Sequence, residues 1–395
     1  MRQFTYGLLL ASVCYGSTAA WADCRNTQDF GTWLNNFKQA AIGTGLSAEV
    51  VNNTLNGITL DQSVIQRDRS QEVFAQTFLE FAGKKVSSYR LSNGQKQMQA
   101  NAKLFQRIEQ EYGVPAPMLT ALWALETDLG AVTGDYPTIR SLATLAYDCR
   151  RPERFRPELI HALWLVQKGD QTPASMRGAW AGELGQLQFL PSGYNQQGVD
   201  FDGDGHRDLI RSKADALASA ANLLRHHGWQ AGQPWLVEVK VPREMNWSKA
   251  RLDNRLPLAE WSAMGVTEAD GDPLRPNGQA ALLLPMGRNG PAFLAFANFD
   301  AIRQWNESTV YATTAAYLAT RFAGANPLYA GNAPVQKLSI TQVRQLQSQL
   351  AARGLPVGKI DGIIGEDTRN AVRQVQQQLG LPADGYPDLV LLRKL

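Results

Sequence analysis

The sequence predicts a mainly α protein with one small β element and a second, shorter helical domain at its C-terminal end. Three observations predict this organisation. Residues 23–324 carry long apolar-periodic segments separated by Gly, Pro and Asn clusters, residues 325–336 have linker composition, and residues 337–395 again carry helical patterns. A chain of 395 residues with a hydrophobic fraction of 44% is long enough for two hydrophobic cores.

Residues 1–22 read as a signal peptide. A positive start, Met1-Arg2, precedes an apolar run over residues 6–13 and an A-x-A cleavage site that ends at Ala22. The run is too short to anchor the chain in a bilayer. Neither Cys14 nor Cys24 is preceded by the residues that a lipid anchor requires. We therefore expect a soluble protein exported to the periplasm, without a membrane anchor.

Cleavage after Ala22 leaves two cysteines, Cys24 and Cys149. Export makes a disulfide possible, so we predict that they are bonded and tie the mature N-terminus to the larger domain. Two buried free thiols are the alternative, because a sequence contains no geometry.

Composition excludes several functional classes. The net charge of +3 comes from scattered Lys and Arg, which argues against a nucleic-acid surface. The four histidines form no HExxH or similar spacing, and two cysteines do not suit a zinc site. A zinc amidase or a cysteine peptidase is therefore disfavoured.

The larger domain contains one segment that alternates like a strand, residues 235–241, which ends at Pro242. A helix is predicted over residues 115–130, because proline suits a first helical turn and glycine the position after the last. The apolar residues that share its buried face are Met118, Leu122, Leu125 and Leu129. Glu126 lies at the edge of this face, where a half-buried carboxyl stays protonated more easily, as a general acid requires. Taken alone, a helical Glu is more often a solvated surface residue.

A glycine-rich segment, residues 179–192, is the second segment that points to a binding site. Glycines let the backbone approach a ligand, and Gln188 has an amide suited to sugar hydroxyl or acetamido groups. Glu183 is a further carboxylate in this segment, for which a structural role is favoured over a catalytic one.

The C-terminal residues 337–395 predict three helices. Val343, Leu346 and Leu350 share one face of the first, Gly354 stops it, and a turn leads to a second helix with Val372, Val375 and Leu379; a short third helix starts at Pro387. The segment resembles the three-helix peptidoglycan-binding domain, through Asp361-Gly-Ile-Ile-Gly365, Thr368, Gln376 and Gly380-Leu-Pro382. A plain three-helix interaction domain is the alternative.

Three motifs of the larger domain occur in the order of one known family: Trp123–Gly130, the glycine-rich segment, and Gln304–Ala312. They resemble the membrane-bound lytic transglycosylase B family and its soluble relatives, which have a lysozyme-like helical core. This resemblance covers nearly the whole chain between residue 23 and the linker. Trp305 departs from it, since tyrosine is typical there, and Ala179 stands where serine is usual.

The resemblance implies that Glu126 is the sole acid/base of a reaction that cleaves peptidoglycan glycan strands and forms 1,6-anhydromuramoyl ends. Gln188, Asn306 and Tyr311 match substrate-contacting positions of the family, and we assign Trp305, Phe189 and Glu183 to the same pocket. Two alternatives remain: a hydrolytic muramidase on the same fold, and a non-catalytic wall-binding protein. We expect the C-terminal domain to raise the enzyme's local concentration on its insoluble substrate. Protein partners are not predicted.

A calcium-binding loop is predicted over residues 200–208. Asp200, Asp202 and Asp204 supply oxygen ligands at alternate positions, and His206 would contribute its backbone carbonyl. The resemblance implies Asp215 as the closing ligand. We expect structural calcium, or sodium in a weaker site, and no cofactor for catalysis; a metal-free turn is the alternative.

Overall fold

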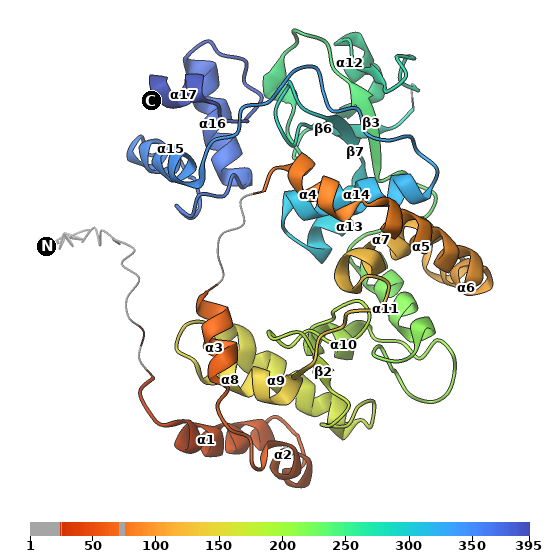
Figure 1. Ribbon diagram of the computed structural model, residues 1–395, viewed down its shortest axis with the longest axis vertical. Coiled ribbons are helices and arrows are strands. Elements are labelled where there is room, and N and C mark those ends of the chain that lie inside the picture. Colours follow the sequence, from red (N-terminus) through yellow and green to blue (C-terminus); the bar gives the residue numbers. More distant parts are fainter. Residues whose placement is uncertain (1–23, 25, 71–75, 276) are drawn as a thin grey trace, which may run out of the picture.

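Helices make up most of the computed structural model, which describes residues 24, 26–70, 76–275 and 277–395 (Figure 1). The mainly α fold class predicted from the sequence is confirmed, with small β-sheets between the helices. The predicted signal peptide, residues 1–22, lies outside the described residues. No helix in the described part of the chain combines the length and hydropathy that crossing a bilayer requires.

The helices of the larger domain are joined by connections of very different length. Their bounds are α1 Phe30–Gly43, α2 Ala48–Leu55, α3 Gln62–Arg69, α4 Phe78–Lys85, α5 Ser88–Ala100, α6 Ala102–Tyr112, α7 Ala116–Thr127, α8 Thr138–Tyr147, α9 Pro152–Gln167, α10 Pro191–Gln197, α11 Lys213–His226, α13 Ala297–Trp305 and α14 Thr309–Phe322. A five-stranded sheet lies between α11 and α13. Local chemistry fixes several ends. Thr77 and Glu80 form a capping box at the start of α4, and Gly113 ends α6 in the left-handed conformation.

Helix α7 lies at the centre of this domain, beside α5, α11 and α14 (Figure 1). Its residues from Met118 to Leu125 are all buried, so it has no solvent face. The sequence predicted a single buried stripe, and that prediction is wrong because neighbouring helices cover α7 on every side. Glu126 is the first half-buried residue after this stretch.

A five-stranded antiparallel sheet interrupts the helices, in the order β4-β6-β7-β3-β5. Its strands are β3 Leu236–Lys240, β4 Arg255–Pro257, β5 Thr267–Glu268, β6 Gln279–Leu283 and β7 Ala292–Ala295, with helix α12 Leu258–Ala263 and a 3-10 turn at Trp247–Lys249. The sheet has its own core, which includes Trp247, Trp261 and Leu282. The sequence predicted only β3. Strands β6 and β7 are buried almost throughout, so they show no polar–apolar alternation.

The three predicted C-terminal helices are present: α15 Ile340–Ala352, α16 Glu366–Gln378 and α17 Leu389–Lys394. Gly354, with a φ of 77°, follows α15 as predicted. Leu379 is not a core residue, since it caps α16 and is exposed. Buried Gln347 holds the turn between α15 and α16, because its amide donates to the carbonyl of Ile363 and accepts from the N–H of Gly362.

The C-terminal domain packs directly on the part of the larger domain that contains the five-stranded sheet. Arg369 of α16 donates to the carbonyls of Leu284 (3.1 Å) and Pro285 (2.5 Å), and buried Arg373 donates to the carbonyl of Ala250. Arg288 of the larger domain pairs with Asp384 at 3.3 Å. Carbonyls and arginines buried in this way fix the relative orientation of the two domains.

Residues 325–336, predicted as a linker, contain no helix or strand but lie against the larger domain (Figure 1). The N–H of Leu328 donates to the Tyr317 hydroxyl, and the Asn332 amide donates to the carbonyl of Val241. Leu328 and Val335 pack on the main hydrophobic core. The linker is therefore packed against the larger domain rather than free in solution.

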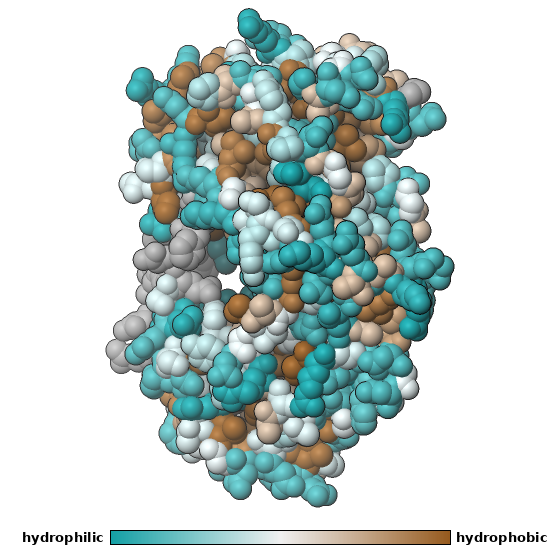
Figure 2. All heavy atoms as spheres, turned by 45° about the vertical axis from the view of Figure 1, so that its right-hand side comes forward, coloured by the Kyte–Doolittle hydropathy of each residue, from teal (hydrophilic) through white to brown (hydrophobic). Residues whose placement is uncertain are grey.

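A disulfide joins Cys24 to Cys149, with a Cα–Cα distance of 5.6 Å across a sequence separation of 125. It links the start of the described chain to the end of α8. Elsewhere the surface is mixed: on the face in Figure 2, hydrophilic residues surround small hydrophobic patches, and the molecule is hollowed near mid-height.

Candidate active site

Glu126 is the penultimate residue of α7, at the point where this buried helix ends. The helix does not stop at Gly130, as the sequence suggested. Asp128, at φ 54°, is the left-handed residue that ends it, and Leu129 (φ 63°) and Gly130 (φ 86°) are also left-handed. This tight reversal places Glu126 at the C-terminal end of α7, where it contacts residues that are distant in the sequence.

Two side chains donate hydrogen bonds to the same oxygen of Glu126. The Tyr311 hydroxyl lies 2.5 Å from Oε1, and the indole N–H of Trp305 lies 3.0 Å from it. Trp305 is the last residue of α13, and Tyr311 lies in the first turn of α14. Oε2 accepts no hydrogen bond within the described chain, so it is the oxygen on which a transferable proton would sit.

Burial is the main influence on the Glu126 carboxyl, and it raises the pKa of this group above the ordinary value for glutamate. The bonds from Tyr311 and Trp305 oppose that rise, because they stabilise the carboxylate. Burial likewise raises the pKa of the Tyr311 phenol, so this hydroxyl stays a hydrogen-bond donor. The arrangement suits a carboxyl that both gives up and takes back a proton.

The glycine-rich segment folds back on itself next to the end of α7. Strand β1, Tyr136–Pro137, pairs with β2, Arg177–Gly178, and single bridges join Gly178 to Leu184 and Leu184 to Phe189. A Cβ on Gly178 would lie 2.0 Å from the carbonyl oxygen of Glu183. Glycine is required here because the backbone passes too close for any side chain.

Gln188, predicted to bind sugar, has an internal role in the structure. Its amide nitrogen donates to the carbonyls of Gly185 (2.9 Å) and Thr133 (3.1 Å), and its backbone is left-handed at φ 52°. Its side-chain oxygen remains available as an acceptor. Phe189 is buried, and its ring lies edge-on to Trp305 with the ring centroids 5.7 Å apart. It supports the indole that holds Glu126.

The other two predicted pocket residues differ in their setting. Glu183 is half-buried, and burial raises its pKa. Its charge also raises the pKa of Glu126, so the two carboxyls lie within electrostatic reach of each other. Asn306 follows α13, and its side-chain oxygen accepts from the N–H of Ser308, which orders the turn that leads to Tyr311.

Two further residues order the end of α7 next to Glu126: Thr127, which the sequence did not single out, and Asp128, for which a solvated or structural role was favoured over a catalytic one. The Thr127 hydroxyl donates to the carbonyl of Gln186 (2.6 Å) and accepts from the N–H of Gly130, so it ties the end of α7 to the glycine-rich segment. Asp128 pairs with Arg90 at 3.1 Å, which supports a structural role for this carboxylate. The position of Thr127 next to Glu126 was the only sequence signal for it.

The predicted metal loop brings three carboxylates together. One oxygen each from Asp200, Asp202 and Asp204 lies within 4.8 Å of the others. Asp200 also accepts the N–H groups of Gly203 and Gly205, which curl the loop around it. A set of hard oxygen donors on a tight loop fits calcium, which takes six to eight oxygens.

Asp215 is buried at the start of α11 and lies outside this group of three. Its carboxylate accepts the N–H groups of Phe201 and Asp208, both at 2.8 Å. It therefore clamps the two ends of the loop. His206 enters the loop through its N–H, which donates to Asp204 at 2.9 Å.

Two family models match the chain in separate segments. Residues 29–320 match the model described as "Transglycosylase SLT domain". Residues 339–395 match the model described as "Putative peptidoglycan binding domain".

Similar proteins carry related names. The membrane-bound lytic murein transglycosylase B of Escherichia coli (strain K12) is 35% identical over 210 residues, which are 52% of this chain and 56% of that protein. The chain thus matches little more than half the length of this relative. SltB3 from Pseudomonas aeruginosa, solved with NAG-NAM-pentapeptide, is 43% identical with a TM-score of 0.87, covering 93% of this chain and 99% of that one.

SltB3 has also been solved with NAG-anhNAM-pentapeptide, at 42% identity and a TM-score of 0.86. The Escherichia coli lytic transglycosylase Slt35, solved in complex with calcium, is 28% identical with a TM-score of 0.62; the match covers 73% of this chain and 92% of that one.

Proposed function

The chain belongs to the transglycosylase SLT domain family, and from that premise we propose that it is a peptidoglycan lytic transglycosylase with Glu126 as its only acid/base. The observation that carries the proposal is the Glu126 carboxyl, whose Oε1 is held by Tyr311 and Trp305 and whose pKa burial raises. The C-terminal peptidoglycan-binding domain supports the same substrate.

Glu126 acts first as an acid. Its proton passes to the glycosidic oxygen between N-acetylmuramic acid and N-acetylglucosamine, and the bond from that oxygen to the muramoyl C1 breaks. The carboxylate then takes the proton of the muramoyl C6 hydroxyl, whose oxygen bonds to C1. The product has a 1,6-anhydromuramoyl end, and Glu126 is again protonated without consumption of water.

One carboxyl suffices for this sequence, whereas most glycosidases use two. Glu183 is the other carboxyl near Glu126, and it would be the base of a hydrolytic alternative. Burial raises the pKa of Glu183, which disfavours the ionised form that a base needs. The anhydro sugar captured with the similar SltB3 supports the lytic route.

Mass spectrometry of the soluble products released from purified sacculi tests this proposal. We expect muropeptides that are lighter by one water than reducing ones. Reducing products would identify a hydrolase, with Glu183 as the candidate base. Sacculi that stay bound without release of product would identify a wall-binding protein.

Replacing Tyr311 by phenylalanine should shift the pH dependence of cleavage. The acid is active while protonated, so activity falls as the pH rises through the Glu126 pKa. Loss of the Tyr311 hydroxyl removes a bond that lowers this pKa, so the decline should move to higher pH. We expect kcat to fall about tenfold as Glu126 loses one of its two orienting bonds. A profile of kcat/KM against pH measures the shift; an unchanged or acid-shifted decline would contradict the assigned role.

We propose that the loop at 200–208 binds calcium through Asp200, Asp202 and Asp204, as Slt35 has been solved in complex with calcium. Calcium at about 100 times its Kd should stabilise the fold by about 2.7 kcal/mol, seen as a higher melting temperature. Asp204→Asn should abolish that shift. Asp272→Asn, which changes an exposed carboxylate elsewhere, should retain it. A wild-type melting temperature that is the same with and without calcium would contradict the proposed site.

We also propose that the protein is exported to the periplasm, where its substrate lies. The disulfide between Cys24 and Cys149 supports this location, because such bonds persist in oxidising compartments.

A further inference from the structure

The two oxygens of the Glu126 carboxyl are not equally available to a substrate. A carboxylate oxygen has about two sites at which it accepts hydrogen bonds. On Oε1 both sites are filled, by the Tyr311 hydroxyl at 2.5 Å and by the Trp305 indole N–H at 3.0 Å. Oε2 accepts no hydrogen bond from the residues that the structure describes. The protein therefore closes one oxygen and leaves the other to the substrate.

Trp305 closes Oε1 in a way that Tyr311 does not. An indole N–H only donates a hydrogen bond, whereas a phenol hydroxyl both donates and accepts. A water molecule at this place could donate to the Tyr311 oxygen, but the indole nitrogen offers it no acceptor. The indole is also the larger ring system, so it covers more of the space beside Oε1. A water can reach this oxygen only by displacing Trp305.

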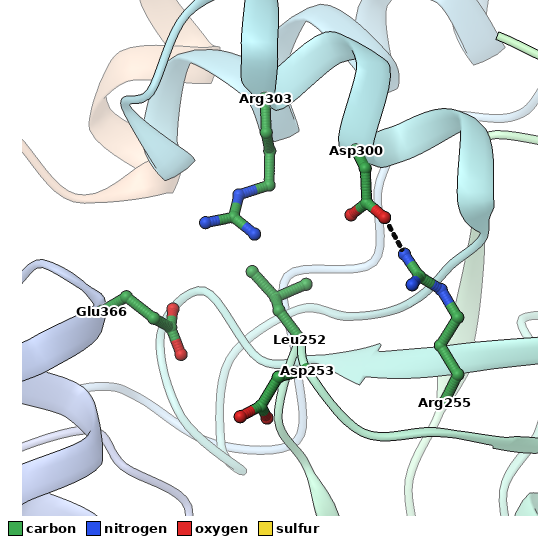
Figure 3. A pocket seen from close by; sticks show the side chains of 6 residues that line it. All are labelled: Leu252, Asp253, Arg255, Asp300, Arg303 and Glu366. Carbon is green, nitrogen blue, oxygen red and sulfur yellow. Dashed lines mark hydrogen bonds and ion pairs between the residues drawn. The ribbon is translucent and has the colours of Figure 1, made fainter. Parts of the chain in front are cut away.

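The indole is held in place by its own helix and by the glycine-rich segment. Its ring lies edge-on to the buried ring of Phe189, with the centroids 5.7 Å apart. Helix α13, which ends at Trp305, is fixed through Asp300, whose carboxylate pairs with Arg255 of β4 at 2.5 Å beside a cavity of about 390 Å³ (Figure 3). Ile302 anchors the same helix in the main core. Movement of the indole away from Oε1 would disturb these contacts.

Two hydroxyl groups can bond to the muramoyl C1 after the glycosidic bond breaks: the C6 hydroxyl of the same sugar, or a water molecule. Each needs a base that takes its proton as its oxygen bonds to C1. The C6 hydroxyl belongs to the reacting sugar, so it has the advantage of an intramolecular group at Oε2. A water held at Oε1 would not compete for that site. Its proton would pass to Oε1, its oxygen would bond to C1, and the product would be a reducing muramoyl end.

We propose that Trp305 is a positioning residue that keeps the cleavage lytic, because its indole occupies the site on Oε1 that a water would need. The inference rests on the proposed function, since it takes Glu126 to be the acid/base. It assigns the choice between anhydro and reducing products to a side chain that does not itself transfer a proton.

The test measures the ratio of reducing to anhydro products by mass spectrometry after digestion of purified glycan strands. Wild-type protein should release anhydro products almost alone. Trp305→Phe keeps an aromatic ring beside Phe189 but removes the donor, and it should raise the ratio about tenfold, the effect of one hydrogen bond. Trp305→Tyr returns a donor and should lower the ratio again. Trp164→Phe is the matched control: it makes the same change at a half-buried position of α9 and should keep the wild-type ratio.

A variant that merely disturbs α13 would slow the release of both products and leave their ratio unchanged; that outcome in Trp305→Phe would overturn the proposal. If Trp305→Phe does not fold, Tyr311→Phe removes the other donor to Oε1, and an unchanged ratio there would overturn it equally. Comparable amounts of both products from the wild type would show that Oε1 is open to water and would also overturn it. Reducing products alone from the wild type would instead refute the lytic function on which the inference rests.

Discussion

Glu126→Gln is expected to lower cleavage of sacculi by about a thousandfold or more, because in the proposed mechanism Glu126 is the only group that transfers protons. Glutamine keeps the shape of the side chain and can still accept the bonds from Trp305 and Tyr311. Release of anhydromuropeptides, followed by chromatography and mass spectrometry, measures the loss. Glu109→Gln is the matched control: it makes the same change at an exposed position of α6, and it should retain most of the activity.

The Glu126→Gln variant should be at least as stable as the wild type at neutral pH. A glutamate whose pKa is higher in the folded than in the unfolded chain lowers the free energy of unfolding. This loss begins near pH 4.5, the unfolded pKa, grows until the pH passes the folded pKa, and persists above it. Glutamine carries no charge and escapes this cost. A denaturant midpoint at pH 7 that matches or exceeds the wild-type value would separate loss of chemistry from loss of fold. Retained activity in the folded variant would refute the role of Glu126.

Gly185→Ala is expected to cost about 3 kcal/mol of unfolding free energy, the largest effect predicted here for a single methyl group. Gly185 has a φ of 75°, and a Cβ there would lie 2.3 Å from the carbonyl oxygen of Leu209. The variant therefore suffers both backbone strain and a collision with the main chain. Because Gly185 also accepts the Gln188 amide, the segment next to the end of α7 should distort and activity should fall.

Gly169→Ala is the matched control, since Gly169 has nearly the same φ, 77°, with no atom within 4 Å of the added Cβ. It isolates the cost of backbone strain, about 1 kcal/mol. Chemical denaturation monitored by circular dichroism gives both values. Equal losses in the two variants would show that the close approach at Leu209 contributes nothing.

The elements that the sequence predicts correctly are those whose signals lie within a few neighbouring residues. Local rules placed α7, α15 and α16 well, because prolines, glycines and apolar spacing act over a few residues. Four of the five strands in the large sheet were not predicted. The buried runs of β6 and β7 look the same in a helix and in a strand, and β4 and β5, with three and two residues, are too short to show alternation. Composition predicts a linker over residues 325–336, but it does not reveal that Leu328 and Asn332 form hydrogen bonds with distant residues of the larger domain.

In the candidate active site, too, local signals are visible in the sequence and contacts between distant segments are not. Glu126 stands out through its own segment, yet its partners Trp305 and Tyr311 are 179 and 185 positions away in the sequence. Only the packing of α14 on α7 brings them together, so no local pattern predicts the pairing, and family resemblance pointed to the motif that contains both.

The disulfide between Cys24 and Cys149 makes the stability of this protein depend on where the chain is. Closing a loop of this length removes conformational freedom from the unfolded chain, worth roughly 4 to 5 kcal/mol in the chain-entropy account. A reducing cytosol withholds that contribution, and an oxidising compartment supplies it. With the export that we propose, the fold of the newly made chain is less stable before transport than after it. It then reaches its full stability only in the compartment that holds the proposed substrate.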